Sequence, residues 1–222
     1  MRHSVRTGTI AALSALLLGA LAIPPTAAAT DGSDATPASR PGTAGPRESG
    51  REVSAQSISS PVRMTDVQFG KVHQIRAVHS EKCLDVQGGS LANGADVFQW
   101  PCLSPGWQNE NQQWYLRPDI DGIMNISPVH SRKCLDVQGK SSKDAANVFQ
   151  WDCLGDAARN QRWFLADERF QYGMWTYAIL AQHSGKCLDV EGASQLNAAN
   201  VFQWTCLGEQ QLNQRWTFHP VK

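Results

Sequence analysis

Apolar and polar residues alternate over short runs in the second half of the chain. Residues 84–86, 97–100 and 114–116 are such runs, and Gly, Asn, Asp or Ser residues follow or separate them. A further apolar run includes Ile75. Alternation over a few residues between turn-forming residues is typical of β-strands, and no stretch has the length and period of an amphipathic helix. The pattern therefore predicts about four short strands in a unit of some fifty residues.

This unit occurs three times. The first copy reads Cys83-Leu84-Asp85-Val86, then Val97-Phe98-Gln99-Trp100, then Asn111-Gln112-Gln113-Trp114. The second reads Cys134-Leu135-Asp136-Val137, Val148-Phe149-Gln150-Trp151 and Asn160-Gln161-Arg162-Trp163. The third reads Cys187-Leu188-Asp189-Val190, Val201-Phe202-Gln203-Trp204 and Asn213-Gln214-Arg215-Trp216. Twelve short strands with threefold repetition predict a closed, pseudo-symmetric all-β architecture, because closure removes exposed strand edges. Closure requires a last strand near residues 215–219 to lie beside a first strand near Val72.

The chain is expected to have three parts. Residues 1–29 have a basic start, a 14-residue apolar run from Ile10 to Ile23 and small residues at the end, as in a secretory signal peptide. A membrane anchor is the alternative, but a spanning helix needs about 20 apolar residues. Residues 30–65 are rich in Gly, Pro, Ser, Thr and Ala and contain no aromatic residue, which predicts a disordered linker. Residues 66–222 hold all eight tryptophans and form the folded domain. The mature protein is thus expected to be secreted and extracellular.

Charge and cysteine content narrow the partners and the cross-links. Without Arg2 and Arg6 the chain has 18 basic and 20 acidic residues, with no basic stripe, so neither nucleic acid nor membrane insertion is expected. Six cysteines in an exported protein predict disulfides rather than a zinc site, which would favour closely spaced pairs. The simplest arrangement is three local bridges with a separation of 19 residues; the rival links each first cysteine to the next unit's second. The local pairs are Cys83–Cys102, Cys134–Cys153 and Cys187–Cys206.

The repeated Cys-Leu-Asp-Val, the second cysteine and the Gln-x-Trp of each unit resemble the ricin B-type lectin family. The resemblance covers residues 70–222 and implies a β-trefoil of three four-strand units. Many members of that family are carbohydrate-binding modules attached to bacterial glycosidases. The resemblance therefore implies a lectin or targeting module.

Each unit has the side chains that a sugar site needs. A sugar has hydroxyls that donate and accept hydrogen bonds and an apolar C–H face, so a site needs a carboxylate, an amide and an aromatic ring. By resemblance, the sugar-binding residues are Asp85, Trp100 and Asn111; Asp136, Trp151 and Asn160; Asp189, Trp204 and Asn213. Gln112, Gln161 and Gln214 are expected to support them, either by orienting the Asp or by satisfying buried backbone groups. Neither a cofactor nor a metal is expected.

Each of these assignments has a structural alternative. The three Asp residues could cap turns, and the three site Trp residues could simply pack on the disulfides. Trp114, Trp163 and Trp216 are expected in the core with Leu84, Leu135 and Leu188. His79, His130 and His183 begin equivalent turns, where a turn-stabilising hydrogen bond is a better interpretation than a shared metal.

One departure from the family pattern bears on the identity of the sugar. Many members have a polar residue two positions before the site aromatic, and this chain has Phe98, Phe149 and Phe202 there. Either a bulge brings Gln99, Gln150 and Gln203 round to the sugar, or the pocket is more apolar than a galactose site.

The function predicted is non-enzymatic binding of neutral glycans through up to three sites. Galactose-ended glycans and plant-wall polysaccharides such as xylan, arabinan or galactan fit the resemblance, with a separate glycosidase as a further partner and a monomeric state. A glycosidase is the second hypothesis, but Asp119, Asp121, Asp167 and Glu168 form no recognisable catalytic pair. The third is a β-trefoil inhibitor of a secreted enzyme, which would not need equivalent polar sites in all units.

Overall fold

A computed structural model describes residues 67–222 of the chain. The expected signal peptide and the whole of the expected linker lie outside the described residues. The first repeat contains β1 (Val72–Ala77), β2 (Cys83–Val86), β3 (Ala95–Trp100) and β4 (Trp114–Pro118). The second contains β5 (Met124–Pro128), β6 (Cys134–Val137), β7 (Ala146–Trp151) and β8 (Trp163–Gln171). The third contains β9 (Met174–Ala181), β10 (Cys187–Val190), β11 (Val201–Trp204) and β12 (Trp216–Pro220). The expectation of four strands in each unit is confirmed.

Short 3-10 turns are the helical elements of the described residues. They are η1 (Gln87–Gly89), η2 (Trp107–Gln112), η3 (Gln138–Lys140), η4 (Arg159–Gln161), η5 (Glu191–Ala193) and η6 (Leu212–Gln214). Within residues 67–222 no helix is long and apolar enough to cross a membrane.

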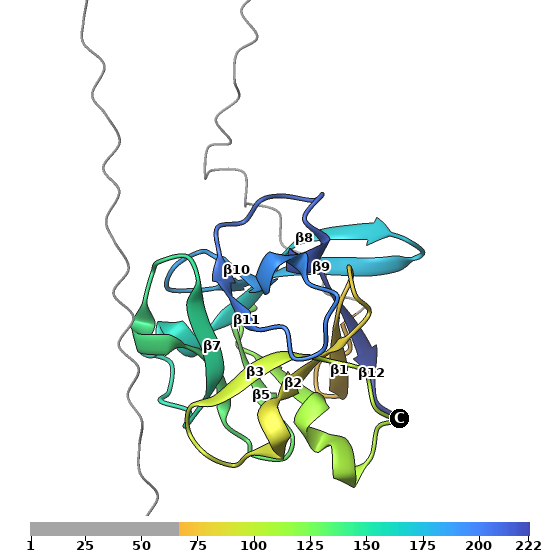
Figure 1. Cartoon of the computed structure of the whole chain (residues 1–222). Coiled ribbons are helices and arrows are strands. Elements are labelled where there is room, and N and C mark those ends of the chain that lie inside the picture. Colours follow the sequence, from red (N-terminus) through yellow and green to blue (C-terminus); the bar gives the residue numbers. More distant parts are fainter. Residues whose placement is uncertain (1–66) are drawn as a thin grey trace, which may run out of the picture. The chain divides into compact units, whose positions relative to one another are not determined.

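The first and last strands of each repeat form a closed barrel. Antiparallel pairing runs from β1 to β12, β9, β8, β5 and β4, and β4 pairs again with β1. The longest register of β1 is with β12, from His73 opposite Pro220 to Ala77 opposite Trp216. The expected closure of the last strand onto the first is therefore confirmed, and it lies beside the C-terminus in Figure 1.

The second and third strands of each repeat form hairpins that cap the barrel (Figure 1). These hairpins are β2–β3, β6–β7 and β10–β11. Neighbouring hairpins also pair with one another: Asp96 lies opposite Phe149, Asn147 opposite Phe202, and Asn200 opposite Phe98. Each cap hairpin thus meets strand residues of both other repeats.

The core consists of equivalent residues from the three repeats. Trp114, Trp163 and Trp216 are fully buried, as are Leu84, Leu135 and Leu188. Each indole Nε1–H donates to the carbonyl oxygen of the Leu in its own repeat, at 2.9–3.0 Å. Burial is affordable for an indole when its single donor is satisfied in this way. The expected core positions of these six residues are confirmed.

All three expected disulfides are present, joining Cys83 to Cys102, Cys134 to Cys153 and Cys187 to Cys206. Each connects the first residue of a cap hairpin's first strand to the segment just after its second strand. The described residues hold no free cysteine.

Buried glutamines join the repeats in a cycle. Gln99 Nε2 donates to the carbonyl oxygens of Ser194 and Leu196 in the third repeat, at 2.6 and 2.8 Å. Gln150 binds the first repeat in the same way, and Gln203 binds the second. The histidines expected to stabilise turns take part as well: Nε2 of His79, His130 and His183 lies 2.8–3.0 Å from the same Ser carbonyl of the neighbouring repeat.

Candidate carbohydrate-binding sites

The cap hairpins bring the predicted Asp and Trp of each repeat together. Asp85 on β2 lies opposite Phe98 on β3, and Cys83 lies opposite Trp100. Because alternate residues of a strand share a face, Phe98 and Trp100 flank Asp85 on the outer face, whereas Leu84 and Gln99 point inward. The same registers hold in β6–β7 and β10–β11. We call the three clusters the first, second and third sites, after their repeats.

Two amides hold each Asp. In the first site, Asn111 Nδ2 donates to one Asp85 carboxylate oxygen at 2.9 Å, and Gln112 Nε2 donates to the other at 2.6 Å. Asn160 and Gln161 hold Asp136 at 3.0 and 2.7 Å, and Asn213 and Gln214 hold Asp189 at 2.9 and 2.6 Å. The carboxylate is therefore fixed in one orientation before any ligand arrives.

The supporting Gln combines the two roles considered for it. Gln161 Nε2 donates to Asp136 and also to the Asp152 carbonyl at 2.9 Å, while its Oε1 accepts from the Leu154 N–H at 2.8 Å. Gln112 and Gln214 make the equivalent bonds. Each Gln both orients the Asp and pairs backbone groups of the segment after the disulfide.

The predicted Asn side chains are also committed within the protein. The amide nitrogens of Asn111, Asn160 and Asn213 donate to the Asp and to the carbonyl of the following Val. Their two N–H groups are thereby used. The amide nitrogen therefore supports the carboxylate, which leaves Oδ1 as the remaining group for the expected bridge to a sugar hydroxyl; Oδ1 of Asn160 is buried without a hydrogen-bond partner.

Each site has a pair of aromatic rings. Phe98 and Trp100 have ring centroids 5.9 Å apart, and the equivalent pairs of the second and third sites have centroids 5.6 Å apart. Trp100 and Trp151 remain 37% and 38% exposed, and Trp204 of the third site is half-buried. Packing on the disulfide therefore leaves a free face of the indole.

The Gln residue of each Phe-Gln-Trp sequence decides between the two interpretations of that sequence. Gln99, Gln150 and Gln203 are fully buried and bind the neighbouring repeat, so no bulge turns them to the outer face. The position that is often polar in the family is occupied here by an aromatic ring, and the site is more apolar than that pattern.

Burial raises the pKa of all three site carboxyls. For Asp85 and Asp136 the loss of solvent outweighs the hydrogen bonds from Gln and Asn, which act in the opposite direction. Burial raises the pKa of Asp189 to about 6, opposed by Gln214 and Asn213 and reinforced by the negative charge of Asp144.

The second site opens into a cavity of about 480 Å³ that includes residues not predicted from the sequence. Besides Asp136, Phe149, Trp151 and Asn160, its wall contains Gly94 and Asp96 of the first repeat, and Gln138, Lys140, Asn147 and Leu154. Asp96 could have been found from the sequence, because it lies four residues before the site Trp and the residue at that position is polar in the other repeats as well. Lys140 occupies the position that Gly89 has in the first repeat and Ala193 has in the third, and neither of those residues is charged.

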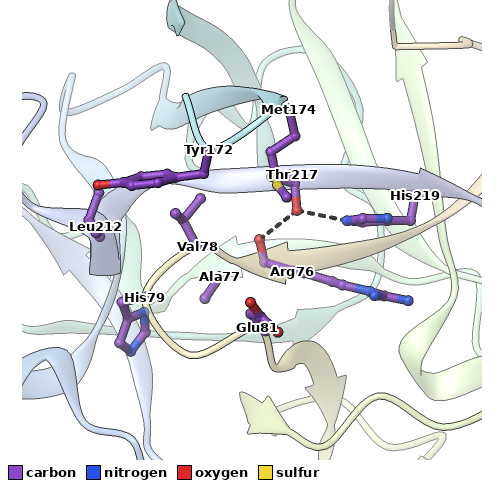
Figure 2. Close-up of a pocket in the computed structure, with 10 residues that line it drawn as sticks. All are labelled: Arg76, Ala77, Val78, His79, Glu81, Tyr172, Met174, Leu212, Thr217 and His219. Atoms are coloured by element: carbon purple, nitrogen blue, oxygen red, sulfur yellow. Dashed lines mark hydrogen bonds between the residues drawn. The ribbon is translucent and has the colours of Figure 1, made fainter. Parts of the chain in front are cut away.

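A separate cavity of about 400 Å³ lies between the turn after β1 and the tip of the β8–β9 hairpin (Figure 2). Tyr172 and Met174 of the hairpin, Glu81 of the turn and His219 of β12 contribute to its wall. Of the residues singled out in the sequence, His79 is the one that lies here. Residues 67–222 contain no group of three or more His, Cys, Asp or Glu side chains that could hold a metal ion.

A pseudo-threefold barrel with three capping hairpins is a β-trefoil, and the clusters on its hairpins place it among trefoils with three equivalent polar and aromatic sites. The model of the ricin-type β-trefoil lectin domain-like family matches residues 64–151 and 159–222. The chain belongs to this family. Comparison with curated proteins gives no match.

Solved structures agree with this assignment. The designed threefold-symmetric protein ThreeFoil is 40% identical, with a TM-score of 0.58, and the match covers 67% of this chain and 97% of ThreeFoil. An exo-β-1,3-galactanase from Clostridium thermocellum is 30% identical with a TM-score of 0.59; the match covers 69% of this chain and 31% of that enzyme. The C-terminal half of the earthworm R-type lectin, solved with GalNAc, is 18% identical with a TM-score of 0.53, and the match covers 68% of this chain and 98% of that chain.

Proposed function

We propose that this protein is a secreted, non-enzymatic lectin or targeting module that binds neutral glycans through its three sites. The observation that carries the proposal is the repetition of one oriented carboxylate beside an indole that is at least partly exposed in every repeat. The earthworm lectin solved with GalNAc and the galactanase from C. thermocellum support a galactose-type or plant-wall glycan as the ligand.

The chemistry of each site suits a sugar ring. The Asp carboxylate accepts hydrogen bonds from hydroxyls, and the exposed face of the Trp stacks on the C–H face of the ring. Because both carboxylate oxygens are already held by amides, little ordering is required on binding. A shallow site of this kind binds a single sugar weakly, with a Kd of roughly 1 mM, or about −4 kcal/mol.

The carboxylates outside the sites favour binding over hydrolysis. Asp119 forms an ion pair with the buried Arg162, and Asp167 forms one with the buried Arg215 at 2.9 Å. Glycoside hydrolysis needs two carboxylates at a set separation across one bond. Carboxylates that are engaged by structural arginines are poorly suited to this role.

Affinity electrophoresis in gels containing galactan, arabinan or xylan tests the proposal. We expect at least one polysaccharide to retard the protein, and replacement of Trp100, Trp151 and Trp204 together by Ala to abolish the retardation. Trp107→Ala is the matched control, because that indole is 81% exposed and outside all three sites. The proposal fails if no glycan retards the protein or if the triple variant still binds.

The same preparations distinguish the other functions. Release of reducing sugar from a retained glycan would indicate a glycosidase. A secreted enzyme that is inhibited equally by the wild type and the triple Trp variant would indicate an inhibitor.

A further inference from the structure

The second site differs from the other two at its rim. Asp96 and Lys140 both contribute to its cavity. The positions equivalent to Asp96 are Asn147 and Asn200, and the positions equivalent to Lys140 are Gly89 and Ala193. A carboxylate and an ammonium group therefore border this site in positions where the pattern of the other repeats has neutral residues.

The pairing of the cap hairpins places Asp96 at this site. Although Asp96 belongs to the first repeat, it lies opposite Phe149 of β7, and its side chain accepts a hydrogen bond from Asn147 Nδ2 at 2.9 Å. Gly94 of the same segment approaches Trp151: a Cβ built at this glycine would lie 3.8 Å from the indole ring. The first repeat thus contributes one wall of the second site.

Lys140 stands on the second repeat's own side of the cavity. It ends η3 in a left-handed conformation with φ +54°, where Gly89 has φ +61° and Ala193 has φ +50°. A lysine is unfavourable in this conformation compared with glycine. Lys140 contributes to the wall of the same cavity as Asp136 and Trp151, so its positive charge borders the pocket.

We propose that the second site has a second subsite, between Asp96 and Lys140, that binds the next sugar residue of a glycan chain. Asp96 has one carboxylate oxygen bound to Asn147, and its other oxygen can accept from a hydroxyl. Lys140 can donate to a hydroxyl or ring oxygen. A volume of about 480 Å³ lies within the range of roughly 300–1,000 Å³ typical of small-molecule sites. This inference rests on the proposed function.

The indole N–H resonances of Trp100, Trp151 and Trp204 allow each site to be titrated separately by ¹⁵N NMR. The probes are galactose with β-1,3-galactobiose, and xylose with xylobiose. For whichever of the two sugars binds, we expect the disaccharide to bind about tenfold more tightly than the monosaccharide at Trp151. At Trp100 and Trp204 we expect the disaccharide and the monosaccharide to bind with nearly equal affinity.

Two substitutions taken from the chain's own repeats serve as tests. Asp96→Asn restores the residue of the equivalent positions, and Lys140→Ala restores that of the third repeat. Together they should remove the tenfold preference at Trp151 and leave monosaccharide affinity within about twofold of the wild type. Neither side chain is a hydrogen-bond partner of Asp136, which Asn160 and Gln161 hold, and an unchanged set of core Trp resonances verifies the fold.

The outcomes separate this inference from the proposed function. If none of the three indoles responds to any probe, the glycan-binding function itself is contradicted for these sugars, and the subsite with it. If Trp151 responds but shows no greater preference for disaccharides than the other two, only the subsite is wrong. A preference that survives both substitutions also overturns it.

Discussion

At the scale of single residues, the buried site carboxyls connect the stability of the folded protein to pH. Asp189 has a pKa of about 6 in the folded protein, above the ordinary 3.8. Between these values the folded state holds a proton that the unfolded chain has released. The free energy of unfolding contributed by this group is therefore largest below pH 4 and decreases as the pH rises through 6.

Asp189→Asn removes this titration. We expect the stability of the wild type relative to the variant to fall between pH 4 and pH 7, by at most ~3 kcal/mol. Urea unfolding of both proteins across this range measures it. The difference between the two proteins is used because burial lowers the pKa of His219 to about 4, which gives both proteins an opposite pH dependence that cancels in the comparison. A relative stability that does not change with pH would contradict the assignment.

The supporting glutamines are predicted to be important for folding. Replacing Gln161 by Leu removes the partners of an Asp136 oxygen, the Asp152 carbonyl and the Leu154 N–H. Loss of partners for buried polar groups costs roughly 1–3 kcal/mol each, so for three groups we expect the variant to lose at least about 3 kcal/mol of stability in urea unfolding. Gln138→Ala, at an exposed residue of the same repeat, should change stability by less than about 0.5 kcal/mol.

At the scale of elements, the β8–β9 hairpin departs from the threefold pattern. Its two strands, Trp163–Gln171 and Met174–Ala181, are longer than β4 and β5, and a bulge follows Ala166. Arg215 anchors the bulge, donating to the Asp167 carboxylate and to the Thr176 carbonyl at 2.9 and 2.8 Å. The hairpin is thus tied to the segment that precedes β12.

The tip of this hairpin offers a stabilising substitution. Tyr172 and Gly173 both have positive φ, at +52° and +77°, as in a type I′ turn. Asparagine tolerates this conformation better than tyrosine. We expect Tyr172→Asn to raise the free energy of unfolding by about 0.5–1 kcal/mol and Tyr172→Val to lower it, measured by urea unfolding. Equal stability of the two variants would contradict this account of the turn.

The turn of the β8–β9 hairpin and the roles of the rim residues of the second site could not be predicted from the sequence. Repetition predicted twelve strands, the disulfides and the buried Trp residues, because every repeat meets the same packing requirement. It did not predict the roles of Asp96 and Lys140, since these positions differ between repeats and their importance depends on one hairpin pairing with the next. The Tyr-Gly turn was missed for a similar reason: tyrosine is not among the residues that usually signal a type I′ turn.

At the scale of the whole molecule, the three repeats form one interlocked unit. Each repeat donates hydrogen bonds from a buried Gln to a neighbour, and the cycle closes from the third repeat to the second, the second to the first and the first to the third. The barrel closes in the same way through β1 and β12. The sites are therefore held at fixed positions relative to one another, which is the condition for multivalent binding to a polymer.

Rigid multivalency predicts different responses to a single sugar and to a polysaccharide. Trp100→Ala should reduce the number of monosaccharides bound per chain from three to two, without changing the affinity of the remaining sites. On a polymeric glycan the same variant should bind at least tenfold more weakly, because losing one attachment removes an effective concentration that can raise avidity by a factor of about 10²–10⁴. Titration calorimetry with the monosaccharide and surface plasmon resonance on the immobilised polysaccharide measure the two effects. A fall in polymer affinity of only about a third would mean that the sites act independently, and the fixed arrangement of the repeats would then have no role in binding.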